Sequence, residues 1–393
     1  MTNTVRFVNS IHKIGQEQWT ALCRTSNPFL RFEFLAALED SHSIGSTESG
    51  WLPHYALLEK QDQLLAIAPV FQKMHSYGEY VFDWGWADAY QRNGLKYYPK
   101  LVWAIPFTPS TGPRIITQAK PEQQAHYVQL IARALTGYCQ HHQFSGWHCL
   151  FPEQSTNEAI SQTPAPLPIM SRTSCQFHWF NENFNDFGHY LEKFTSRKRK
   201  NIKKERSRLQ SLGFQFSTKT ADEITPSDIE TFYHCYQLTY AKRNMRGYLS
   251  LEFFQLILQS MPEQLVLVQA QQVSTSLACA LYFKDDDNLY GRYWGCLEEF
   301  DSLHFECCYY QGIEYCIEHD ISHFDPGTQG EHKISRGFEP TLCHSQHWIA
   351  HPQFSQAIND FLLAEKSDVQ NYMTQVTSNL PFKTADLRLK NPQ

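Results

Sequence analysis

The segment 193–208 constrains the fold most strongly, because it must keep a dense cationic surface in water while burying apolar side chains. It holds nine lysines and arginines and one glutamate, a net charge of +8. The whole chain carries −6, so the remainder carries −14. Apolar residues recur through this region at helical spacing: Leu191, Phe194, Ile202 and Leu209. The pattern predicts a helix over 185–212, capped by Gly213, with one buried stripe and one cationic face.

A cationic face of this density is suited to phosphates or other polyanions. The alternative is a charged helix that only faces solvent, which is the usual interpretation of an isolated charge run. The density of this charge run and the acidic remainder of the chain make a polyanion site as good an explanation as a solvent-facing helix. The candidate binding residues on this face are Arg197, Lys200 and Lys204.

Length and composition narrow the class of protein. The chain of 393 residues is long enough for two domains, and 42% hydrophobic and 14% aromatic residues supply packed cores. No apolar run reaches the roughly 18 residues of a membrane span, and the polar first residues do not resemble a signal peptide, so we expect a cytoplasmic protein. The eleven cysteines are scattered without a Cys-x-x-Cys pair, so we expect free thiols and no metal site.

The first half of the chain shows strand and helix patterns in turn. Two strands are predicted over 54–59 and 64–71, joined by a hairpin turn at 61–63. A long helix is predicted over 121–142, and the proline-rich segment 162–168 is the candidate domain boundary.

An unusual stretch, 76–90, mixes aromatic rings with carboxylates. Large rings beside carboxylates are typical of a cleft for a polar ligand, which makes Asp83, Trp84 and Asp88 candidate binding residues. A half-buried strand capped by aspartates is the alternative.

Two further cations of the first half are candidate ligand-binding residues. Lys100 follows the Tyr-Tyr-Pro sequence that begins at Tyr97. Arg114 ends the segment 106–114, whose prolines and glycine predict a rigid turn that can fix polar groups.

The second half begins with a strand and the basic helix. Further elements are predicted in this order: a strand at 214–218, helices at 226–242 and 251–260, three antiparallel strands at 265–270, 276–283 and 288–295, a helix at 302–319 and a strand at 323–325.

This order resembles the Gcn5-related acyltransferase fold. With an earlier half of similar build and the Phe-Thr-Ser-Arg-Lys-Arg-Lys-Asn-Ile-Lys-Lys sequence, the chain resembles the FemAB-like family of that superfamily over residues 27–348. The motifs that carry the resemblance lie at 76–84, 97–100, 106–114 and 324–338.

The resemblance implies an α/β fold of two tandem acyltransferase-like domains with mixed, mostly antiparallel sheets flanked by helices. We expect these domains at 1–168 and 169–355, followed by a helical and polar tail at 356–393.

The resemblance also implies a function in peptidoglycan biosynthesis. The expected enzyme moves an acyl or aminoacyl group from a phosphate-bearing donor, such as aminoacyl-tRNA, to the amine of a small-molecule or peptide acceptor. The sequence departs from acetyl-CoA-dependent relatives, because the segment 295–301 carries carboxylates where a glycine-rich pyrophosphate loop would stand. Acetyl-CoA is therefore the less favoured donor.

Two carboxylates are candidates for the chemistry itself. Asp325 and Glu331 flank a Pro-Gly-Thr-Gln-Gly segment, and either can hold or deprotonate an acceptor amine. A helix cap or an ion pair to Lys333 or Arg336 is an equally good explanation of each.

The remaining candidates are cationic or lie on a strand. Lys333 and Arg336 are placed to bind a phosphate or carboxylate. Arg292 and Tyr293 are neighbours on a strand and face opposite sides of it, and an arginine on a central strand is costly to bury without a partner.

The residues leave two other functions open. One is a binding module that keeps the fold without chemistry and recognises a cell-wall precursor or another anionic ligand. The other is a CoA-dependent N-acyltransferase with an unusual pyrophosphate loop.

Overall fold

The computed structural model describes residues 3–165, 168–242, 244–273, 275–328 and 330–383. The chain forms two compact units, each built from two stretches of sequence. Residues 1–174 and 343–370 make the first unit, and residues 175–342 and 371–393 make the second.

Three elements pass from one unit into the other: β9 (Met170–Phe180), β15 (Glu339–Ile349) and α12 (Pro352–Ser378). The predicted ranges 1–168, 169–355 and 356–393 do not coincide with the two units, because residues 343–370 return to the first unit. Residues 166–167 of the proline-rich segment and residues 384–393 of the predicted tail lie outside the described residues. No helix in the described part of the chain combines the length and apolar character needed to cross a bilayer.

The first unit contains short strands and five further helices. Its strands are β1 (Thr4–Val8), β2 (Trp51–Pro53), β3 (Tyr55–Lys60), β4 (Gln63–Ala68), β5 (Val70–Lys73), β6 (Lys100–Trp103), β7 (Ile116–Thr117) and β8 (Gly146–Leu150). Its helices are α1 (Gln16–Leu22), α2 (Phe32–Asp40), α3 (Trp84–Arg92), α4 (Pro121–His142) and α5 (Gln154–Ser161), with 3₁₀ turns η1 (Ile11–Lys13) and η2 (Pro28–Leu30).

The strands of the first unit follow two orders, β1-β3-β4-β7 and β15-β8-β6-β5-β2. Strands β6 and β8 pair in parallel, whereas β5–β6 and β8–β15 are antiparallel. The predicted turn at 61–63 is confirmed, because Gln61 and Asp62 both have positive φ and join β3 to β4. The predicted strand 64–71 is two strands, which part at Pro69 because proline has no amide hydrogen for a ladder.

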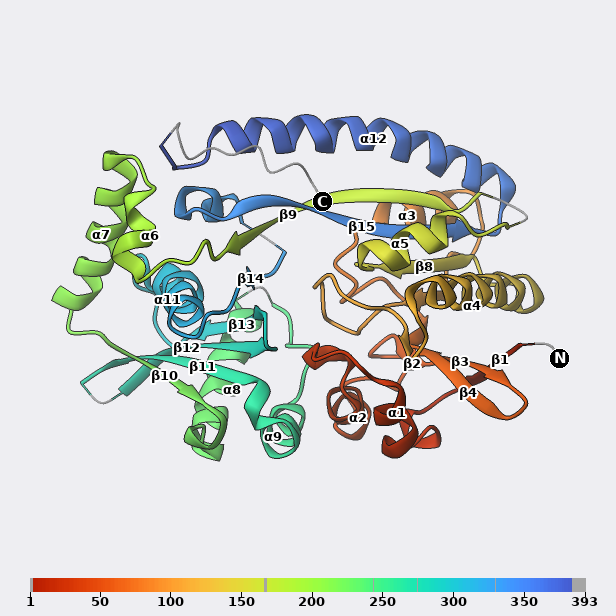
Figure 1. The fold of residues 1–393 in the computed structure, drawn as a ribbon, viewed down its shortest axis with the longest axis horizontal. Helices are drawn as coiled ribbons and strands as arrows, with labels where there is room; N and C mark the ends of the chain where they lie inside the picture. Colours follow the sequence, from red (N-terminus) through yellow and green to blue (C-terminus); the bar gives the residue numbers. More distant parts are fainter. Residues whose placement is uncertain (1–2, 166–167, 243, 274, 329, 384–393) are drawn as a thin grey trace. The chain divides into compact units, whose positions relative to one another are not determined.

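Helix α4 covers the core of the first unit and has the predicted bounds 121–142. Its apolar positions fall three and four residues apart, so they form one face. That face packs on Trp103 and Trp147, both fully buried, and Figure 1 shows α4 alongside β8. The α4 residues in this core include Val128, Ile131, Leu135 and Cys139.

The second unit is one sheet with helices on both sides. Its further strands are β10 (Gln215–Thr220), β11 (Leu265–Gln272), β12 (Thr275–Lys284), β13 (Asn288–Cys296) and β14 (His323–Asp325). Its further helices are α6 (Phe187–Glu192), α7 (Ser196–Ser211), α8 (Pro226–Ala241), α9 (Leu251–Ser260), α10 (Leu303–Phe305) and α11 (Gln311–Glu318). Shorter turns are η3 (Ala221–Glu223), η4 (Pro262–Gln264), the π-helical η5 (Glu306–Tyr310) and the 3₁₀ turn η6 (Glu331–Arg336).

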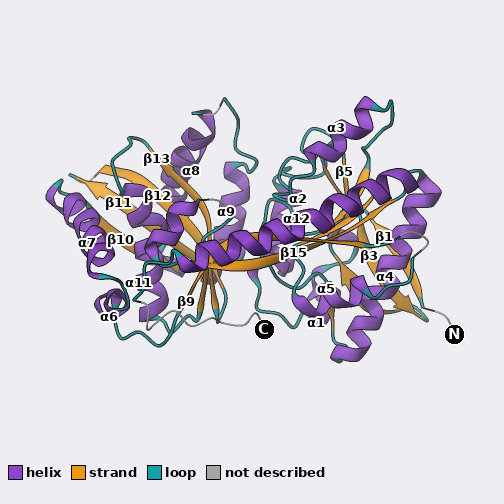
Figure 2. Ribbon diagram, turned by 90° about the horizontal axis from the view of Figure 1, so that it is seen from above, coloured by secondary structure: helices purple, strands orange, loops and turns teal. Residues whose placement is uncertain are grey.

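Strand order in the second unit is β10-β11-β12-β13-β14-β9. Only the β13–β14 pair is parallel among its described strands, so the predicted mixed and mostly antiparallel sheet is confirmed. Figure 1 shows α11 and α8 on opposite sides of this sheet, and in Figure 2 the helices again flank the strands. Both faces of β11 and β12 are therefore covered, which explains their nearly continuous apolar sequences.

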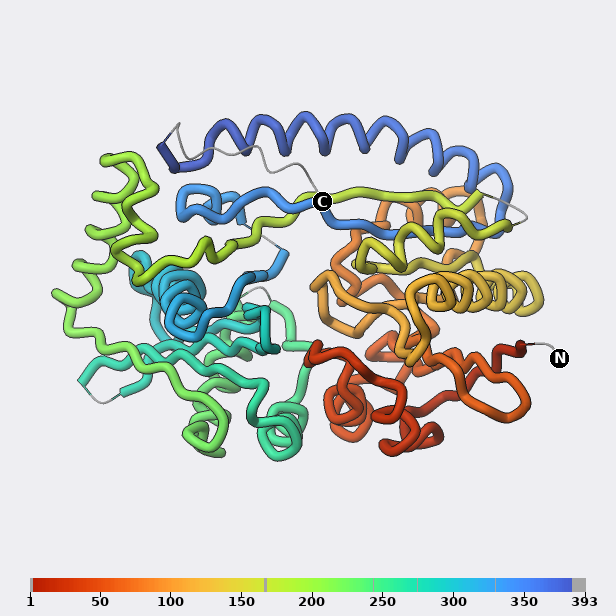
Figure 3. The backbone as a smooth tube through the Cα atoms, in the orientation of Figure 1, coloured from red at the N-terminus to blue at the C-terminus, as the bar shows by residue number. Residues whose placement is uncertain are grey.

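Two predicted helices are interrupted. The helix predicted over 185–212 is divided into α6 and α7, which can be followed as separate coils in Figure 3. Between them, Lys193 and Thr195 bond through their backbones to Lys383 and Pro381 at 2.8 and 2.9 Å. The helix predicted over 302–319 is divided by the π-helical turn η5, a feature that is frequent at functional sites.

Candidate functional site

Helix α7 has the predicted apolar stripe on one side. Ile202 and Leu209 are buried in the core of the second unit. Arg197, Lys200 and Lys204 lie between about 160° and 220° around the helix axis from Ile202, so they face away from that core. All three side chains are exposed to solvent. They form an exposed surface on α7.

Most cations of α7 have no acidic partner in the described part of the chain. Within the described ranges, no carboxylate forms an ion pair with the following residues: Arg197, Lys198, Arg199, Lys200, Lys203 and Lys204. The exceptions are Arg206 and Arg208, and Arg208 contacts the exposed Asp301. The unpaired cations concentrate positive charge, which attracts polyanions.

Arg206 is the cation that fastens α7 to the rest of the second unit. Its guanidinium donates to Glu306 at 2.8 Å and to Glu314 at 2.6 Å. Gln311 also donates to Glu306, at 2.8 Å. Glu306 is buried in the π-helical turn, and this burial raises the pKa of its carboxyl although Arg206 opposes the shift. This network is structural and leaves the outer face of α7 open.

The ladder between β13 and β14 ends beside the predicted catalytic segment. Their parallel pairing runs to Tyr290 and Asp325. The next residue, Gly291, packs closely against Pro326. A Cβ atom added to Gly291 would stand only 3.1 Å from the Pro326 Cα. The register between β12 and β13 then shifts, and Arg292 is the extra residue of a β-bulge. Bulges often redirect side chains next to active sites.

The structure brings Asp325 and Lys333 together at this point. Lys333 is only 1% exposed, and its ammonium donates to the carbonyl of Gly327. Burial lowers the pKa of Lys333 to about 8, although the nearby Asp325 opposes the shift. Asp325 is also buried and accepts from the Gly327 amide at 2.9 Å. A buried amine with a lowered pKa and a buried carboxylate thus both bond to the backbone of Gly327.

Two histidines that were not predicted complete this polar cluster. His178 Nε2 lies 3.6 Å from Asp325, and His178 Nδ1 lies 2.9 Å from His323 Nε2. Burial lowers the pKa of His178 to about 3, so its ring is neutral. His178 is on β9 and His323 on β14, and only strand pairing brings them together. The sequence contained no spacing signal for this pair.

Glu331 and Arg336 have other partners. Glu331 is exposed and accepts from Tyr372 of α12 at 2.7 Å, in a position that does not suit a buried general base. Arg336 is buried and donates to Glu205 of α7 at 2.9 Å. Of the two predicted carboxylates, Asp325 is the one placed beside Lys333.

Arg292 and Tyr293 point to different environments, as expected for neighbours on a strand. Tyr293 is 9% exposed and packs edge-on against Phe254 and Tyr236. It belongs to an aromatic core beneath the sheet and not to an open site. Arg292 is half-buried at the bulge, with its guanidinium 5.7 Å from the Tyr293 ring.

In the first unit, Lys100 and Asp83, which were predicted separately as binding residues, are paired to one another. Lys100 is fully buried and donates to Glu79 at 2.9 Å, to Ser76 at 3.0 Å and to Asp83. Tyr97 also donates to Asp83, at 2.6 Å. The pKa of Lys100 is lowered by burial but raised more strongly by its two carboxylate neighbours, to about 12.

A second buried lysine, Lys73, lies in the same cluster and was not predicted. Its ammonium stands 3.8 Å from the centre of the Trp51 ring and donates to the carbonyl of Tyr77 at 3.0 Å. Burial lowers the pKa of Lys73 to about 7, and burial raises the pKa of Glu79 to about 7. The cluster thus maintains one full ion pair, Lys100 with Asp83, while Lys73 and Glu79 are partly ionised at neutral pH.

The raised pKa of Glu79 predicts a stability that depends on pH. Between its ordinary value of 4.5 and about 7, the folded protein binds more protons than the unfolded chain. We therefore expect wild type to lose stability relative to Glu79→Gln as pH rises through this window. The difference in unfolding free energy, wild type minus variant, should fall by up to about 3 kcal/mol. Urea unfolding of both proteins at stepped pH measures this difference. A difference that stays level or rises with pH would contradict the assignment.

The other predicted residues of the first unit are separate from this cluster. Trp84 begins helix α3 and is 41% exposed, and Asp88 forms a surface ion pair with Arg92 at 2.7 Å. Arg114 is buried, and its guanidinium donates to the backbone carbonyls of Leu150 and Ser110 at 2.8 and 2.7 Å. The predicted cleft over 76–90 is instead a loop and a helix packed over a buried ion cluster.

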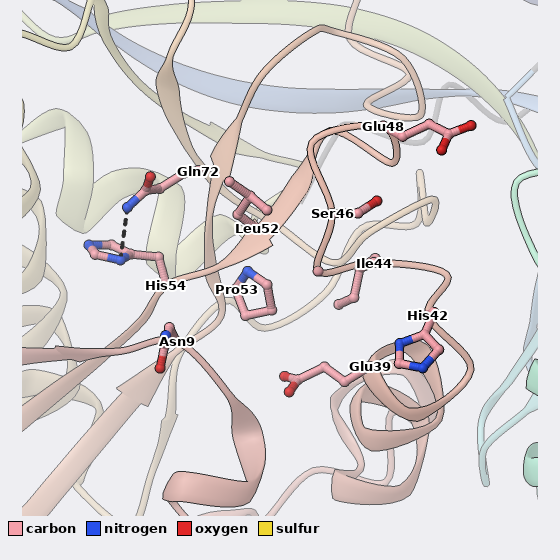
Figure 4. A pocket seen from close by; sticks show the side chains of 11 residues that line it. Asn9, Glu39, His42, Ile44, Ser46, Glu48, Leu52, Pro53, His54 and Gln72 are labelled. Carbon is pink, nitrogen blue, oxygen red and sulfur yellow. Dashed lines mark hydrogen bonds between the residues drawn. The ribbon is translucent and has the colours of Figure 1, made fainter.

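The first unit has a shallow pocket of about 690 Å³ beside β2 and α2 (Figure 4). Glu39 and His54 are among its lining residues. The Glu39 carboxylate is already bonded to Tyr55 at 2.8 Å and to Ser10 at 2.7 Å, and His54 is bonded to Gln72 at 3.2 Å, as drawn in Figure 4. These bonds are structural, and the pocket contains no predicted site residue. Among the described residues, no three His, Cys, Asp or Glu side chains gather as metal ligands.

Two solved structures with TM-scores above 0.5 have a similar fold. A DUF2156 domain from Agrobacterium fabrum is 8% identical, with 90% of this chain and 97% of that chain covered and a TM-score of 0.53. A protein of unknown function from Bacteroides thetaiotaomicron is 11% identical, with 88% and 99% covered and a TM-score of 0.51. FemX is 10% identical, with 91% and 100% covered and a TM-score of 0.47. Identities this low show the fold alone.

No curated protein matches the sequence. The predicted α/β class, with mixed and mostly antiparallel sheets flanked by helices, is confirmed in the described residues. A family model described as peptidoglycan biosynthesis/recognition matches residues 10–384. Because this match covers nearly the whole chain, the protein belongs to the FemAB-like family, and this membership points to an acyl or aminoacyl transferase.

Proposed function

We propose that this protein transfers an aminoacyl group from aminoacyl-tRNA, or an acyl group from a similar phosphate-bearing donor, to the amine of a peptidoglycan precursor in the cytoplasm. The observation that carries the proposal is the unpaired cationic face of α7, on a chain that belongs to the FemAB-like family. Such a face concentrates positive charge, which attracts a polyanion.

The shape of that face favours an extended polyanion. Arg197, Lys200 and Lys204 are exposed on a convex helix, so a small ligand would contact few of them at once. A nucleic acid backbone presents phosphates at regular intervals and can contact several. This difference favours tRNA over a single pyrophosphate group.

The helix that would receive a CoA pyrophosphate is poorly suited to it. Helix α10 has three residues, and Glu306 directly follows it. Glu298, Glu299 and Asp301 precede it, so this segment has carboxylates in place of a glycine-rich loop, although Glu299 pairs with Lys242 and Asp301 with Arg208. These features disfavour acetyl-CoA as the donor.

The cluster around Asp325 and Lys333 supplies the groups that the chemistry needs. The acceptor amine must lose a proton to attack the ester carbonyl, the carbonyl oxygen gains negative charge, and the ribose oxygen takes a proton as the ester C–O bond breaks. Asp325 is suited to hold the acceptor ammonium and to take up the proton that the ammonium loses before attack. Lys333, with a pKa near 8, is suited to donate a hydrogen bond to the developing oxyanion and a proton to the leaving oxygen.

The test combines binding with turnover. We expect the protein to bind charged tRNA, with an affinity that falls steeply as salt rises, and to add the mass of an aminoacyl group to a UDP-sugar peptide. Uncharged tRNA and acetyl-CoA serve as comparison donors. Tight, saturable acetyl-CoA binding without tRNA binding would overturn the proposal. Binding of the precursor without any mass change would favour the binding module.

A further inference from the structure

A chain of hydrogen bonds leads from the buried carboxyl of Asp325 to the turn between β12 and β13. His178 Nε2 lies 3.6 Å from Asp325, and His178 Nδ1 lies 2.9 Å from His323 Nε2. His323 Nδ1 lies 2.7 Å from the side-chain oxygen of Asn288, whose amide nitrogen donates to Asp285 at 2.8 Å. His178 is 3% exposed, whereas His323 and Asp285 are half-buried. The two histidines therefore connect a buried acid to a more exposed part of the second unit.

The outer end of this chain fixes the direction of its hydrogen bonds. A carboxylate only accepts, so Asp285 orients the Asn288 amide with its nitrogen towards Asp285 and its oxygen towards His323. His323 Nδ1 therefore carries a hydrogen. In a neutral ring the other nitrogen is then bare, so His323 Nε2 accepts and His178 Nδ1 donates. By the same rule, Nε2 of a neutral His178 carries no hydrogen.

The inner end of the chain can take one further proton. His178 Nε2 lies 3.0 Å from the side-chain oxygen of Gln176 and 3.6 Å from Asp325. The contacts of the two rings with Gln176, with one another and with Asn288 call for three hydrogens, whereas two neutral rings supply two. A buried contact between two acceptors is unfavourable, and a proton on His178 Nε2 relieves it.

The charged groups around the two rings determine where such a proton is held. Burial lowers the pKa of His178 to about 3, and His323 and Lys333 lower it further, while Asp325 opposes the shift. Burial also lowers the pKa of His323, against the opposing effects of Asp325 and Asp285. Both rings are thus neutral before a proton arrives. The added charge is better tolerated on His323, because that ring is partly exposed and two carboxylates stabilise its cation.

The proposed reaction needs a proton acceptor beyond Asp325. An ammonium acceptor and an ester give a neutral amide, a neutral alcohol and one free proton. Asp325 is 2% exposed, and a protonated Asp325 has lost the charge that holds the acceptor. A base next to Asp325 restores its carboxylate while the site is still occupied.

We propose that the His178–His323 pair accepts this proton from Asp325 and holds it until the product leaves. The Asp325 O–H bond breaks as an N–H bond forms at His178 Nε2, and the hydrogen of His178 Nδ1 passes to His323 Nε2. When the product departs, the same transfers run in reverse and Asp325 gives the proton to water. Both histidines act through Asp325, so they are positioning residues. The inference rests on the proposed function, because that reaction supplies the proton.

Nitrogen NMR of protein labelled at histidine with the heavy nitrogen isotope tests the pair without any turnover. In wild type at pH 7, both rings should be neutral, with the hydrogen on Nδ1 and with Nε2 bare. On acidification the two rings should gain their first proton as one unit. The spectra of His178→Gln and His323→Gln assign the signals. A hydrogen on Nε2 of either ring, or a doubly protonated ring at pH 7, would contradict the inference.

Transfer rates across a pH series test the role of the pair in the reaction. His178→Gln should lower the rate of transfer to a UDP-sugar peptide by about 100-fold at pH 7. The loss should shrink to less than about tenfold near pH 9, because more of the acceptor amine is then neutral before it binds. A merely structural loss would be equal at every pH. His323→Gln should show the same trend, and His319→Gln, at an exposed histidine after α11, is the matched control.

The outcomes separate this inference from the proposed function. If both variants transfer at the rate of wild type, or lose the same factor at every pH, the pair does not accept the proton and the proposed function stands. If wild type transfers no group from any donor, the proposed function fails and the role of the pair fails with it. Circular dichroism of each variant verifies folding, and either folded variant suffices for the test.

Discussion

Reversing the charge of Arg197, Lys200 and Lys204 to glutamate should weaken tRNA binding by about 100-fold or more near 0.1 M salt and abolish transfer. Each phosphate contact releases counterions, so removing three contacts should lower the slope of log affinity against log salt concentration by about 2 to 3. Repulsion by the new carboxylates adds to this loss. The side chains are exposed, so the fold should be unaffected. Filter binding across a salt series measures both the affinity and the slope.

The matched control reverses three lysines of the first unit. Lys60, Lys96 and Lys120 are exposed and form no ion pair within the described ranges. Their reversal changes the net charge by the same amount and should reduce tRNA binding far less. Equal losses in the two triple variants would mean that net charge, and not the α7 face, governs binding. Unchanged turnover in the α7 variant would disprove the role of this face.

Replacing Lys100 by methionine should destabilise the first unit by about 3 to 5 kcal/mol at neutral pH. Methionine retains most of the volume but leaves Asp83 as a buried charge without its cation, and removing one partner of a buried pair has this effect. Glu79 contributes less, because its pKa near 7 allows it to take up a proton. The loss should shrink at acidic pH, where Asp83 can also be protonated. Thermal and urea unfolding of both proteins measure the change.

Two variants make this result specific. Arg92→Met breaks the exposed pair with Asp88 and should cost less than about 1 kcal/mol. Adding Asp83→Asn and Glu79→Gln to Lys100→Met should restore part of the stability, because no buried charge is then left without a partner. A loss below about 1 kcal/mol in Lys100→Met would show that the cluster is hydrated or rearranges freely.

Local patterns in the sequence predicted much of the second unit. The apolar stripe of α7, the helices at 226–242 and 251–260 and the order of the three antiparallel strands all agree with the structure. These features depend on the spacing of side chains within one segment, which the sequence displays directly. The break between α6 and α7 was not predictable, because residues 381–383 pair with it from far along the chain.

The site was predicted less completely, for the same physical reason. Charge and turn chemistry in the sequence suggested Asp325, Lys333 and the α7 cations as candidates. It could not show that Glu331 is exposed, that Arg336 is bound to Glu205, or that Arg114 serves the backbone. Each of these facts depends on which distant groups come within hydrogen-bond distance.

The sequence by itself determined the cationic helix, the strand and helix order and the family resemblance, because each resides in short stretches of adjacent residues. Only the tertiary structure decided that Lys100 and Asp83 neutralise one another and that His178 and His323 meet beside Asp325. Burial and pairing are properties of the folded chain, because they arise from contacts between segments that are far apart in the sequence. No local sequence pattern shows that such segments come into contact.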